Sequence, residues 1–436
     1  MTHDNPKLNL PKGWRLVPLN RVVDIIPSNV DKKIYAHELP IRLCNYMDVY
    51  SNNYLSRAIQ FSSGSVTLAE LQKFRLKQED VIITKDSETP DDIAVPAVVI
   101  EDLGNVVCGY HLALLRPNGE ITGTYLSKAL QTHLCRRHFG NSANGATRYG
   151  LTQKVISRCP ILLPTQQEQA KISQILTTLD KAIEKSEHII NKYERIKTGL
   201  MQDLLTRGID EQGNIRSEKT HEFKDSPLGR IPKDWEVKKL GECCDGRISY
   251  GINSAAIPYS FEFPTYLRIT DIDESGNLNS YSRVSVKYPE SGSYYLNEED
   301  VVFARTGNTT GKSYYHFDYT ERLVFAGFLV RARTIKSILL GKYLFYFSKS
   351  HNFKKWVKIM SMRSGQPGIS GKEYESLKLP LPKLNEQKKI VSIIDKQNEM
   401  IQKEKRNLGK LVSQKTGLMQ DLLTGKVSVN ALFKRL

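Results

Sequence analysis

One stretch of the sequence comes close to a phosphate-binding loop. It runs from Thr306 to Ser313 and reads TGNTTGKS, whereas that loop follows the pattern G-x-x-x-x-G-K-[ST]. The first glycine is missing, because position 306 is Thr. The residues that follow, YYHFDYT, are typical of a strand and not of the helix whose N-terminus would hold the anion. We therefore interpret this stretch as a turn and not as an ATPase site.

The same turn has residues suited to contact nucleic acid. Its small residues let backbone N–H groups approach phosphates, while a flanking arginine can reach a base edge. The candidate DNA contacts here are Arg305, Thr306, Asn308, Thr309 and Lys312. A plain hairpin turn without a ligand is the alternative interpretation.

Two polar loops supply further candidates. One runs from Ser361 to Gly368 and the other from Asn141 to Gly150, each ahead of a long helical segment. Arginine is suited to guanine, and glutamine or asparagine to adenine. The candidates in these loops are Asn144, Thr147, Arg148, Arg363, Ser364 and Gln366. Either loop alone would be interpreted as a linker, but their matching places favour a recognition role.

Composition points in the same direction. The 436 residues include 63 Lys and Arg against 47 Asp and Glu, and the net charge of +16 favours a polyanionic partner. The motifs of serine hydrolases, zinc proteases, dinucleotide-binding enzymes and amino-methyltransferases are missing from the sequence. The six cysteines include no Cys-x-x-Cys, so we expect them reduced and buried, with no metal and no cofactor. Without an apolar span or a secretion signal, we expect a soluble, cytoplasmic protein with no membrane contact.

An internal repeat organises the chain. Ten residues, KTGLMQDLLT, occur at 197–206 and again at 415–424. Further matches are Glu168-Gln169 with Glu386-Gln387, LPKGW at 10–14 with IPKDW at 231–235, and LKQEDVIITK at 76–85 with LNEEDVVFAR at 296–305. The copies agree best at their ends and least in their middles. The ends should therefore do the same job twice, while the middles read two different targets.

Each copy ends in a segment that predicts a long helix. Thr165 with Glu168 is a capping box, so the helices should start near residues 165 and 385 and run for about 40 residues, or roughly 60 Å. Apolar residues recur in alternating steps of four and three, the pattern of a coiled coil. The seam residues are Ile172, Leu176, Leu179, Ile183, Leu200 and Leu204 in the first helix and Ile390, Ile394, Ile401, Leu408, Leu418 and Leu422 in the second.

The ends of a domain usually lie close together, so the second helix is expected to run back along the first. This predicts two globular units at opposite ends of an antiparallel coiled coil, related by a pseudo-two-fold axis. The globular units mix strand-like and helical segments, which makes the fold class α+β. The predicted strands include 81–84, 97–100, 301–304 and 323–330, and the predicted helices include 125–139 and 341–360.

Together these features resemble the specificity subunit of type I restriction-modification systems. Over essentially the whole chain, two variable domains open with P-K-x-W, close with P-x-x-x-E-Q-x-K-I and lead into a helix that ends in K-T-G-L-M-Q-D-L-L-T. The resemblance implies a non-catalytic subunit whose two target-recognition domains each read one half of an asymmetric, interrupted site on double-stranded DNA. It also implies that the helices set the gap and dock two methyltransferase subunits, to which restriction subunits with translocase and nuclease activity add.

The resemblance implies the following boundaries: target-recognition domains at 1–160 and 231–380, helical spacers at 161–210 and 381–425, a linker at 211–230 and a tail at 426–436. The first domain departs from the family, because it has Lys85-Asp86-Ser87-Glu88 where the second has Arg305-Thr306-Gly307-Asn308. Lys85 is therefore the candidate contact at that place. Arg42 and Arg268 match a strand-borne arginine of the family, and each either contacts DNA or packs.

Two other functional classes stay open on the sequence. One is a stand-alone DNA-acting enzyme, a nuclease or an NTPase that uses the 306–313 loop. The other is a free-standing DNA-binding regulator, which would bind its site tightly without partners.

Overall fold

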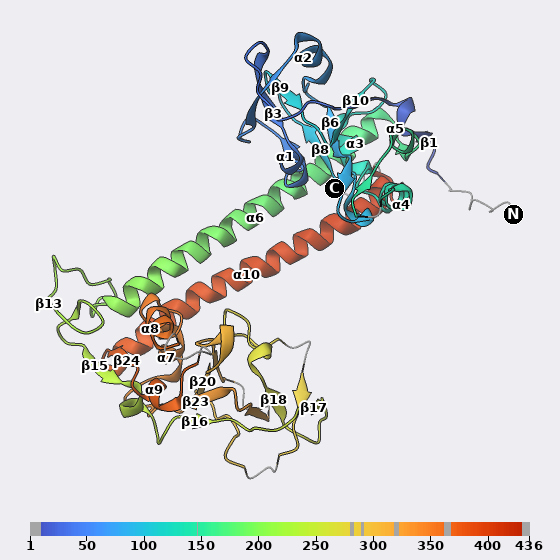
Figure 1. The fold of residues 1–436 in the computed structure, drawn as a ribbon. Helices are drawn as coiled ribbons and strands as arrows, with labels where there is room; N and C mark the ends of the chain where they lie inside the picture. Colours follow the sequence, from blue (N-terminus) through green and yellow to red (C-terminus); the bar gives the residue numbers. More distant parts are fainter. Residues whose placement is uncertain are drawn as a thin grey trace. The chain divides into compact units, whose positions relative to one another are not determined.

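The computed structural model describes residues 10–145, 147–279, 283–288, 292–317, 322–361 and 368–429 (Figure 1). The chain divides into two compact units. Unit 1 is Met1–Glu187 with Arg406–Leu436, and unit 2 is His188–Lys405. Both boundaries fall inside long helices, α6 (Gln166–Thr206) and α10 (Leu384–Leu423), so each unit contains part of both helices.

Unit 1 is a mixed α/β unit. Its strands are β1 (Arg15–Pro18), β2 (Val23–Pro27), β3 (Leu39–Cys44), β4 (Tyr54–Leu55), β5 (Ser62–Val66), β6 (Val81–Thr84), β7 (Asp86–Ser87), β8 (Pro96–Val99), β9 (Val106–Cys108), β10 (Leu112–Pro117), β11 (Tyr149–Gly150) and β12 (Pro160–Leu163). Its short helices are α1 (Tyr46–Tyr50), α2 (Leu68–Phe74), α3 (Gly123–Ala129), α4 (His133–Ser142) and α5 (Gln153–Ser157). The described strands form sheets in the orders β2-β10-β6-β8-β4, β5-β3-β9, β1-β12 and β11-β7.

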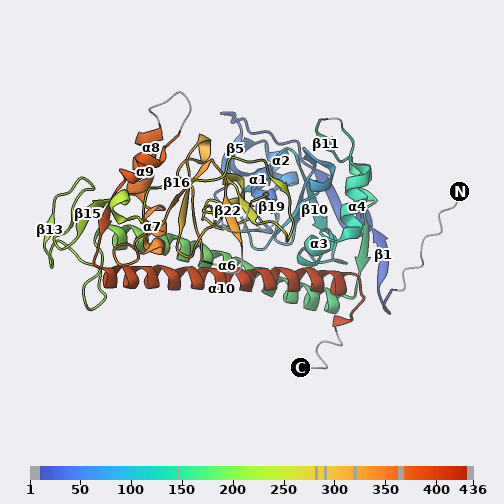
Figure 2. The same cartoon turned by 90° about the horizontal axis from the view of Figure 1, so that it is seen from below.

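Unit 2 has the same class of architecture. Its strands are β13 (Phe223–Lys224), β14 (Ile231–Pro232), β15 (Glu236–Lys239), β16 (Ser249–Tyr250), β17 (Ile257–Pro258), β18 (Thr265–Leu267), β19 (Val284–Ser285), β20 (Val301–Ala304), β21 (Ser313–Tyr315), β22 (Leu323–Phe325), β23 (Leu329–Ala332) and β24 (Lys378–Leu381). Its short helices are α7 (Gly341–Phe347), α8 (His351–Ser361) and α9 (Gly371–Glu375). The described strands form sheets in the orders β16-β23-β20-β21, β17-β19-β18-β22, β15-β24 and β13-β14. Figure 2 shows α7 beside α10, on the helix side of this unit.

The long helices start where the sequence predicts. Thr165 N donates to Glu168 Oε2 at 3.3 Å, and Glu168 N donates to Thr165 Oγ1 at 3.4 Å, so the predicted capping box forms. Helix α6 has 41 residues and α10 has 40, close to the predicted length. None of the helices in the described ranges combines the length and apolar character that a membrane span needs.

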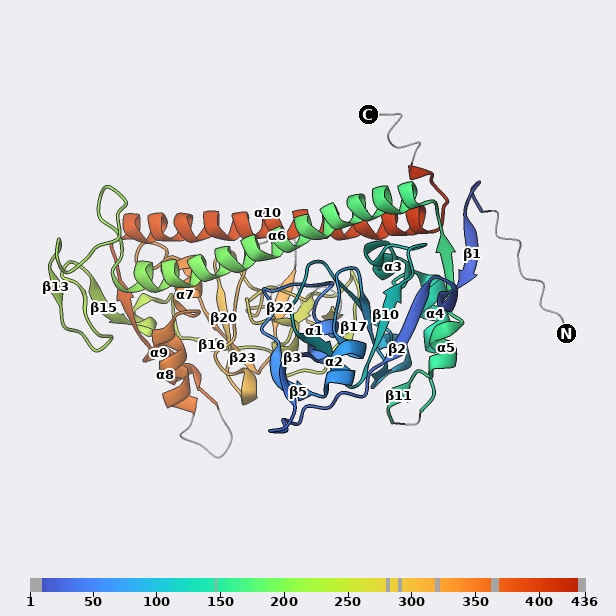
Figure 3. The ribbon, with the colours of Figure 1, turned by 90° about the horizontal axis from the view of Figure 1, so that it is seen from above.

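In unit 1 the two long helices run antiparallel. The Nζ atom of Lys415 lies 2.6 Å from Oδ1 of Asp180, and Asn407 Nδ2 donates to Ser186 Oγ at 3.3 Å. Residue numbers therefore rise along α6 while they fall along α10 (Figure 3). Ser186 interrupts the apolar seam in the sequence, and the contact with Asn407 gives its buried hydroxyl a partner.

In unit 2 the same direction holds. Gln397 Nε2 donates to the carbonyl oxygen of Tyr193 at 3.1 Å, and Ile209 N, just beyond α6, donates to Glu386 Oε1 at 2.9 Å. All twelve predicted seam residues are buried or half-buried: Ile172, Leu176, Leu179, Ile183, Leu200, Leu204, Ile390, Ile394, Ile401, Leu408, Leu418 and Leu422. The apolar pattern thus marks the face of each helix that is withdrawn from water.

Gln169 and Gln387 make matching contacts. Gln169 accepts from Thr122 N at 2.9 Å and donates to the carbonyl oxygens of Glu120 and Pro164 at 3.0 and 3.1 Å. Gln387 accepts from Leu340 N and donates to the carbonyl oxygens of Ile338 and Pro382. Both side chains are fully buried. Each glutamine therefore fastens the first turn of its long helix to the globular part of its own unit.

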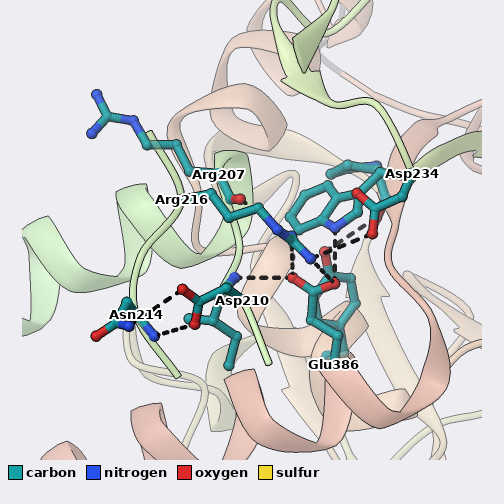
Figure 4. Close-up of polar contacts among 10 residues, drawn as sticks. Arg207, Asp210, Asn214, Arg216, Asp234 and Glu386 are labelled. Carbon is teal, nitrogen blue, oxygen red and sulfur yellow. Dashed lines mark hydrogen bonds and ion pairs between the residues drawn. The ribbon is translucent and has the colours of Figure 1, made fainter. Parts of the chain in front are cut away.

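Glu386 has a different role from Glu168 (Figure 4). Its carboxylate accepts from Ile209 N, from Trp235 Nε1 at 3.1 Å, and from Arg216 at 2.7 and 3.2 Å. Only about a tenth of the Arg216 and Glu386 side chains is exposed, at 11% and 10%. The predicted linker 211–230 is therefore anchored at Arg216, which joins the end of α6 to the start of α10 within unit 2.

Three predicted elements are wrong, each because a polar or glycine turn interrupts an apolar run. The predicted helix 125–139 is two helices, since Thr132 caps α4 and accepts from Cys135 N. The predicted helix 341–360 is α7 and α8, with Ser350 Oγ accepting from Phe353 N at 3.3 Å. The predicted strand 323–330 is β22 and β23, joined by a turn in which Leu329 N donates to Ala326 O. The other three predicted strands correspond to β6, β8 and β20.

All six cysteines are buried and free, as predicted. Burial raises the pKa of the Cys243 thiol to about 11. This thiol is therefore protonated at neutral pH and behaves as a small apolar side chain.

Candidate nucleic-acid interface

In unit 1 the structure brings Lys85 to the loop 141–150. Strand β7, directly after Lys85, pairs antiparallel with β11, and Leu151 N donates to Lys85 O at 2.9 Å. Arg148 lies 2.8 Å from Asp86 Oδ1. Asn144 exchanges backbone hydrogen bonds with Gly150. Three predicted contacts, Lys85, Asn144 and Arg148, thus belong to one loop pair, which consists of the segment 85–87 and the loop 141–150. The exposed Thr147 lies within the loop 141–150.

In unit 2 an equivalent loop pair forms at Arg305. The β20–β21 connection contains a short 3-10 helix, Gly307–Thr309, and Ile369 N donates to Arg305 O at 2.8 Å. Thr306 forms a backbone bridge with Gly368, at the end of the second polar loop. Three candidates of that loop, Arg363, Ser364 and Gln366, lie outside the described residues.

The turn after Arg305 is a hairpin, as one interpretation of the sequence held. Strands β20 and β21 pair antiparallel, and Ser313 begins a strand where a phosphate loop would begin a helix. Lys312 lies 2.7 Å from the exposed carboxylate of Glu274. A surface ion pair of this kind contributes little stability and leaves the lysine able to change partner.

A hollow of about 220 Å³ lies beside this hairpin, lined by Asn308, Thr309, Lys312, Lys349 and Lys354 among others. Burial lowers the pKa of Lys349 to about 8. Its Nζ lies 3.3 Å from Ser313 O and 3.4 Å from Glu274 O. The lysines make this side of the hairpin basic.

Lys85 and Arg305 occupy the same backbone position in their units. Lys85 N donates to His111 O at 2.8 Å, and Arg305 N donates to Phe328 O at 3.0 Å. The carbonyl oxygens of Lys85 and Arg305 accept from Leu151 N and Ile369 N, and each of these donors directly follows the polar loop of its own unit. The two basic side chains therefore leave equivalent strand ends.

Both cations also lie over a tyrosine ring. Lys85 Nζ is 5.1 Å from the ring centroid of Tyr110, and Arg305 Cζ is 4.9 Å from that of Tyr250. Both tyrosines are partly exposed, at 50% and 43%. Sequence reasoning missed them, because neither is near its cation in the chain and no periodic pattern marks them.

Arg42 and Arg268 do not belong to these loop pairs. Arg42, on β3, donates to Phe61 O at 3.3 Å and lines a separate hollow of about 740 Å³ together with Arg57. Arg268 follows β18 and donates to both carboxylate oxygens of Asp271, at 3.0 and 2.7 Å, and these hydrogen bonds raise its pKa. The charge of Arg268 is thus already countered inside its unit.

In each unit an element that adjoins the polar loop lies on the side away from the long helices. In unit 1, β11 lies on the side opposite α6, and in unit 2, α8, which leads into the second polar loop, lies on the side opposite α10 (Figures 2 and 3). In the described parts of the chain, no group of three His, Cys, Asp or Glu side chains is arranged to hold a metal ion.

Comparisons with known proteins agree over both halves. A family model described as the type I restriction modification DNA specificity domain matches residues 11–195 and again residues 232–411. The chain is 22% identical over 422 residues to the putative type I restriction enzyme MjaX specificity subunit of Methanocaldococcus jannaschii, covering 96% of this chain and 95% of that protein. It is also 22% identical over 472 residues to the type I restriction enzyme EcoKI specificity subunit of Escherichia coli K12, covering 98% and 95%.

Two solved structures show the same fold. The S subunit of a type I restriction-modification system from M. genitalium aligns with a TM-score of 0.58 at 14% identity, covering 97% of this chain and 98% of that one. A chain from a structure of type I R-M complex assembly and conformational transition aligns with a TM-score of 0.54 at 17% identity, covering 96% and 100%.

Proposed function

The chain belongs to the type I restriction-modification DNA specificity family, and from this premise we propose that it is the non-catalytic subunit that reads double-stranded DNA for such a complex. The main support for this proposal is that each unit contains a loop pair in an equivalent place. Each places a basic side chain at the same strand end, within loops of different sequence. Equal placement with unequal sequence suits two domains that read different bases.

Each unit would read one half of an asymmetric, interrupted site. The target-recognition domains would be residues 1–160 and 231–380. Arg148 and Arg305 carry donors for a guanine edge, and Asn144 and Asn308 for an adenine edge. The basic residues Lys312, Lys349 and Lys354 would bind backbone phosphates, which position the protein without selecting a sequence.

The two long helices would form one antiparallel coiled coil through both units. The seam residues and the contacts found separately in each unit support this, since they share one direction and one register. We assign to this coiled coil the spacing of the half-sites and the docking of two methyltransferase subunits. Restriction subunits with translocase and nuclease activity would add to that complex, in the cytoplasm where its DNA is accessible.

The stand-alone NTPase or nuclease is the weaker alternative. The hairpin at 306–313 lacks the helix N-terminus that would hold a nucleotide phosphate. The purified chain should therefore show no ATP hydrolysis and no DNA cleavage. Catalysis that is lost in Lys312→Ala would contradict the proposal.

The direct test is methylome sequencing. The chain would be produced with its methyltransferase subunit in a host that lacks this modification. We expect methylation at one bipartite motif with a fixed gap, and none when either subunit is omitted. Replacing residues 1–160 by the corresponding domain of a relative should change one half of the motif only. A continuous motif, or methylation without this chain, would refute the assigned function.

A further inference from the structure

We propose that Tyr250 and Tyr110 are positioning residues for specificity, each holding the cation above it, Arg305 or Lys85, in the orientation that reads a guanine. The inference rests on the proposed DNA-reading function. It goes beyond that function because it assigns a role to two side chains outside the polar loops.

The tyrosines come from different places in the two units. Tyr250 on β16 lies opposite Val330 on β23. In unit 1 the counterpart of Val330 is Ala113 on β10, because Val330 pairs with Phe303 and Ala113 pairs with the matching residue Ile83. The residue opposite Ala113 is Pro27, which has no ring to support a cation in this way. The ring under Lys85 is supplied instead by Tyr110, two residues after β9.

The position that holds Tyr110 in unit 1 likewise has no ring in unit 2. Tyr110 directly precedes His111, whose carbonyl oxygen accepts from Lys85 N. The matching carbonyl in unit 2 belongs to Phe328, and the residue before it is Gly327, which has no side chain to support a cation. Each unit therefore places a ring under its cation from a position that holds no ring in the other unit: strand β16 in unit 2 and the β9–β10 turn in unit 1.

The side chain of Arg305 has unused hydrogen-bonding capacity. Its Nε is buried, and no acceptor for it is found in the described part of the chain. A buried donor without an acceptor is unfavourable, so a movement of the Arg305 side chain that gives Nε an acceptor is favoured. A guanidinium above a ring can still present its terminal N–H donors to a ligand, and guanine offers O6 and N7 as two acceptors in its major-groove edge.

The ring of Tyr250 is itself fixed. Its hydroxyl oxygen accepts from Gly371 N at 2.8 Å, at the capped start of α9. The ring cannot turn away without losing that hydrogen bond. Arg305 is half-buried and Tyr250 is 43% exposed, so a ligand can reach this pair of side chains from solvent.

The test uses the complex with its methyltransferase subunit. Binding is measured on probes that carry each single base-pair change in either half-site. Tyr250→Leu should lower discrimination at one G·C pair by about tenfold or more, in the half-site read by unit 2 only. Tyr110→Leu should do the same in the other half-site. Tyr250→Phe, which keeps the ring, should retain most of the discrimination.

Tyr259→Leu is the matched control, because Tyr259 is an exposed tyrosine of unit 2, at 40%, and contacts Phe261 rather than a loop-pair cation. It should leave discrimination unchanged. Arg305→Ala removes the cation and its donors, so it should lose discrimination at the same base pair as Tyr250→Leu. Unchanged discrimination in folded Tyr250→Leu, or an equal loss at every position of both half-sites, would overturn the inference. Absence of any bipartite preference in the wild-type complex would instead refute the proposed function.

Discussion

The ion pair between Lys415 and Asp180 joins the two long helices inside unit 1, with 2.6 Å between Nζ and Oδ1. Lys415 belongs to the second copy of KTGLMQDLLT, and its counterpart in the first copy is Lys197. Lys197 is half-buried, and burial lowers its pKa. The two identical copies of the decapeptide therefore have different neighbours, because the first copy lies in unit 2 and the second in unit 1.

Asp180→Asn is expected to destabilise unit 1 strongly. Asp180 also contacts Lys128, whose side chain is fully buried, and accepts from Tyr54 OH at 2.6 Å. Burial raises the pKa of Asp180, but the neighbouring lysines outweigh it and the net pKa is lowered. Removing the carboxylate leaves a buried ammonium without its partner, which costs about 3–5 kcal/mol. Urea unfolding measures the loss.

Asp395→Asn is the matched control for that variant. Asp395 contacts Lys342 in unit 2, at 2.8 Å, but the side chains are 27% and 35% exposed. Water can therefore solvate the lysine that is left, and the loss of stability should be clearly smaller. Equal losses in the two variants would contradict the role given to burial.

Lys349→Met is expected to change the pH dependence of stability. Burial lowers the pKa of Lys349 to about 8, whereas an unfolded lysine has a pKa of about 10.4. Between these values the unfolded chain binds more protons, so this group makes wild-type stability rise with pH. Below about pH 8 both states are protonated and the cost of burying the charge is fully present. The stability of wild type relative to Lys349→Met should thus increase from pH 8 to 10.

Urea unfolding at several pH values would measure this difference, and Lys358→Met, at an exposed position of α8, is the control. A constant difference between wild type and Lys349→Met across this range would show that Lys349 has an ordinary pKa.

Arg305→Ala and Lys312→Ala should have different effects on DNA binding. Loss of Arg305 should relax recognition of one half-site, because a lost bidentate base contact costs about 1–3 kcal/mol. Loss of Lys312 should weaken binding to all sequences and reduce the slope of log affinity against log salt by about one unit. Titrations of the complex on altered probes at several salt concentrations separate the two. Identical profiles for the two variants would contradict the assignment of base and phosphate contacts.

A matched insertion in the long helices should lengthen the unread gap. Seven residues inserted after Ile183, with seven after Leu411, fall between the contacts Asp180–Lys415 and Ser186–Asn407. A full heptad keeps the seam in register and adds about 10 Å, or about three base pairs of DNA. Methylome sequencing should report unchanged half-sites with a longer gap. An unchanged gap would show that the helices do not set the spacing. The control is an insertion of seven residues in α6 alone, which lengthens one helix without the other.

The long helices were predictable because their signals are local and repeated. Thr165 with Glu168 marks the start of α6, and the heptad spacing marks the side that becomes buried. The apolar pattern does not show that a new helix starts after Thr132 and after Ser350, because apolar residues continue on both sides of each. The side-chain hydroxyls that cap these helices are the signal that could have shown it. Local cap chemistry decided those boundaries.

The candidate interface was only partly predictable. The polar loops were identified by composition and by their matching places, and Lys85 by its alignment with Arg305. Tyr110 and Tyr250 could not be identified in this way, because strand register brings Tyr250 to its cation and the β9–β10 turn brings Tyr110 to its cation. The two copies also differ at these positions, so comparing one half of the chain with the other hides them.

The contacts of Glu386 limit where this chain can be recombined with a relative. A junction between Arg216 and Trp235 would draw two donors of one buried carboxylate from different parents, and any mismatch would leave that charge without a partner. A junction inside the first KTGLMQDLLT, at 197–206, in contrast, keeps Ile209, Arg216, Trp235 and Glu386 from one parent. A crossover at the first copy of the decapeptide would therefore keep the buried carboxylate of Glu386 together with its donors.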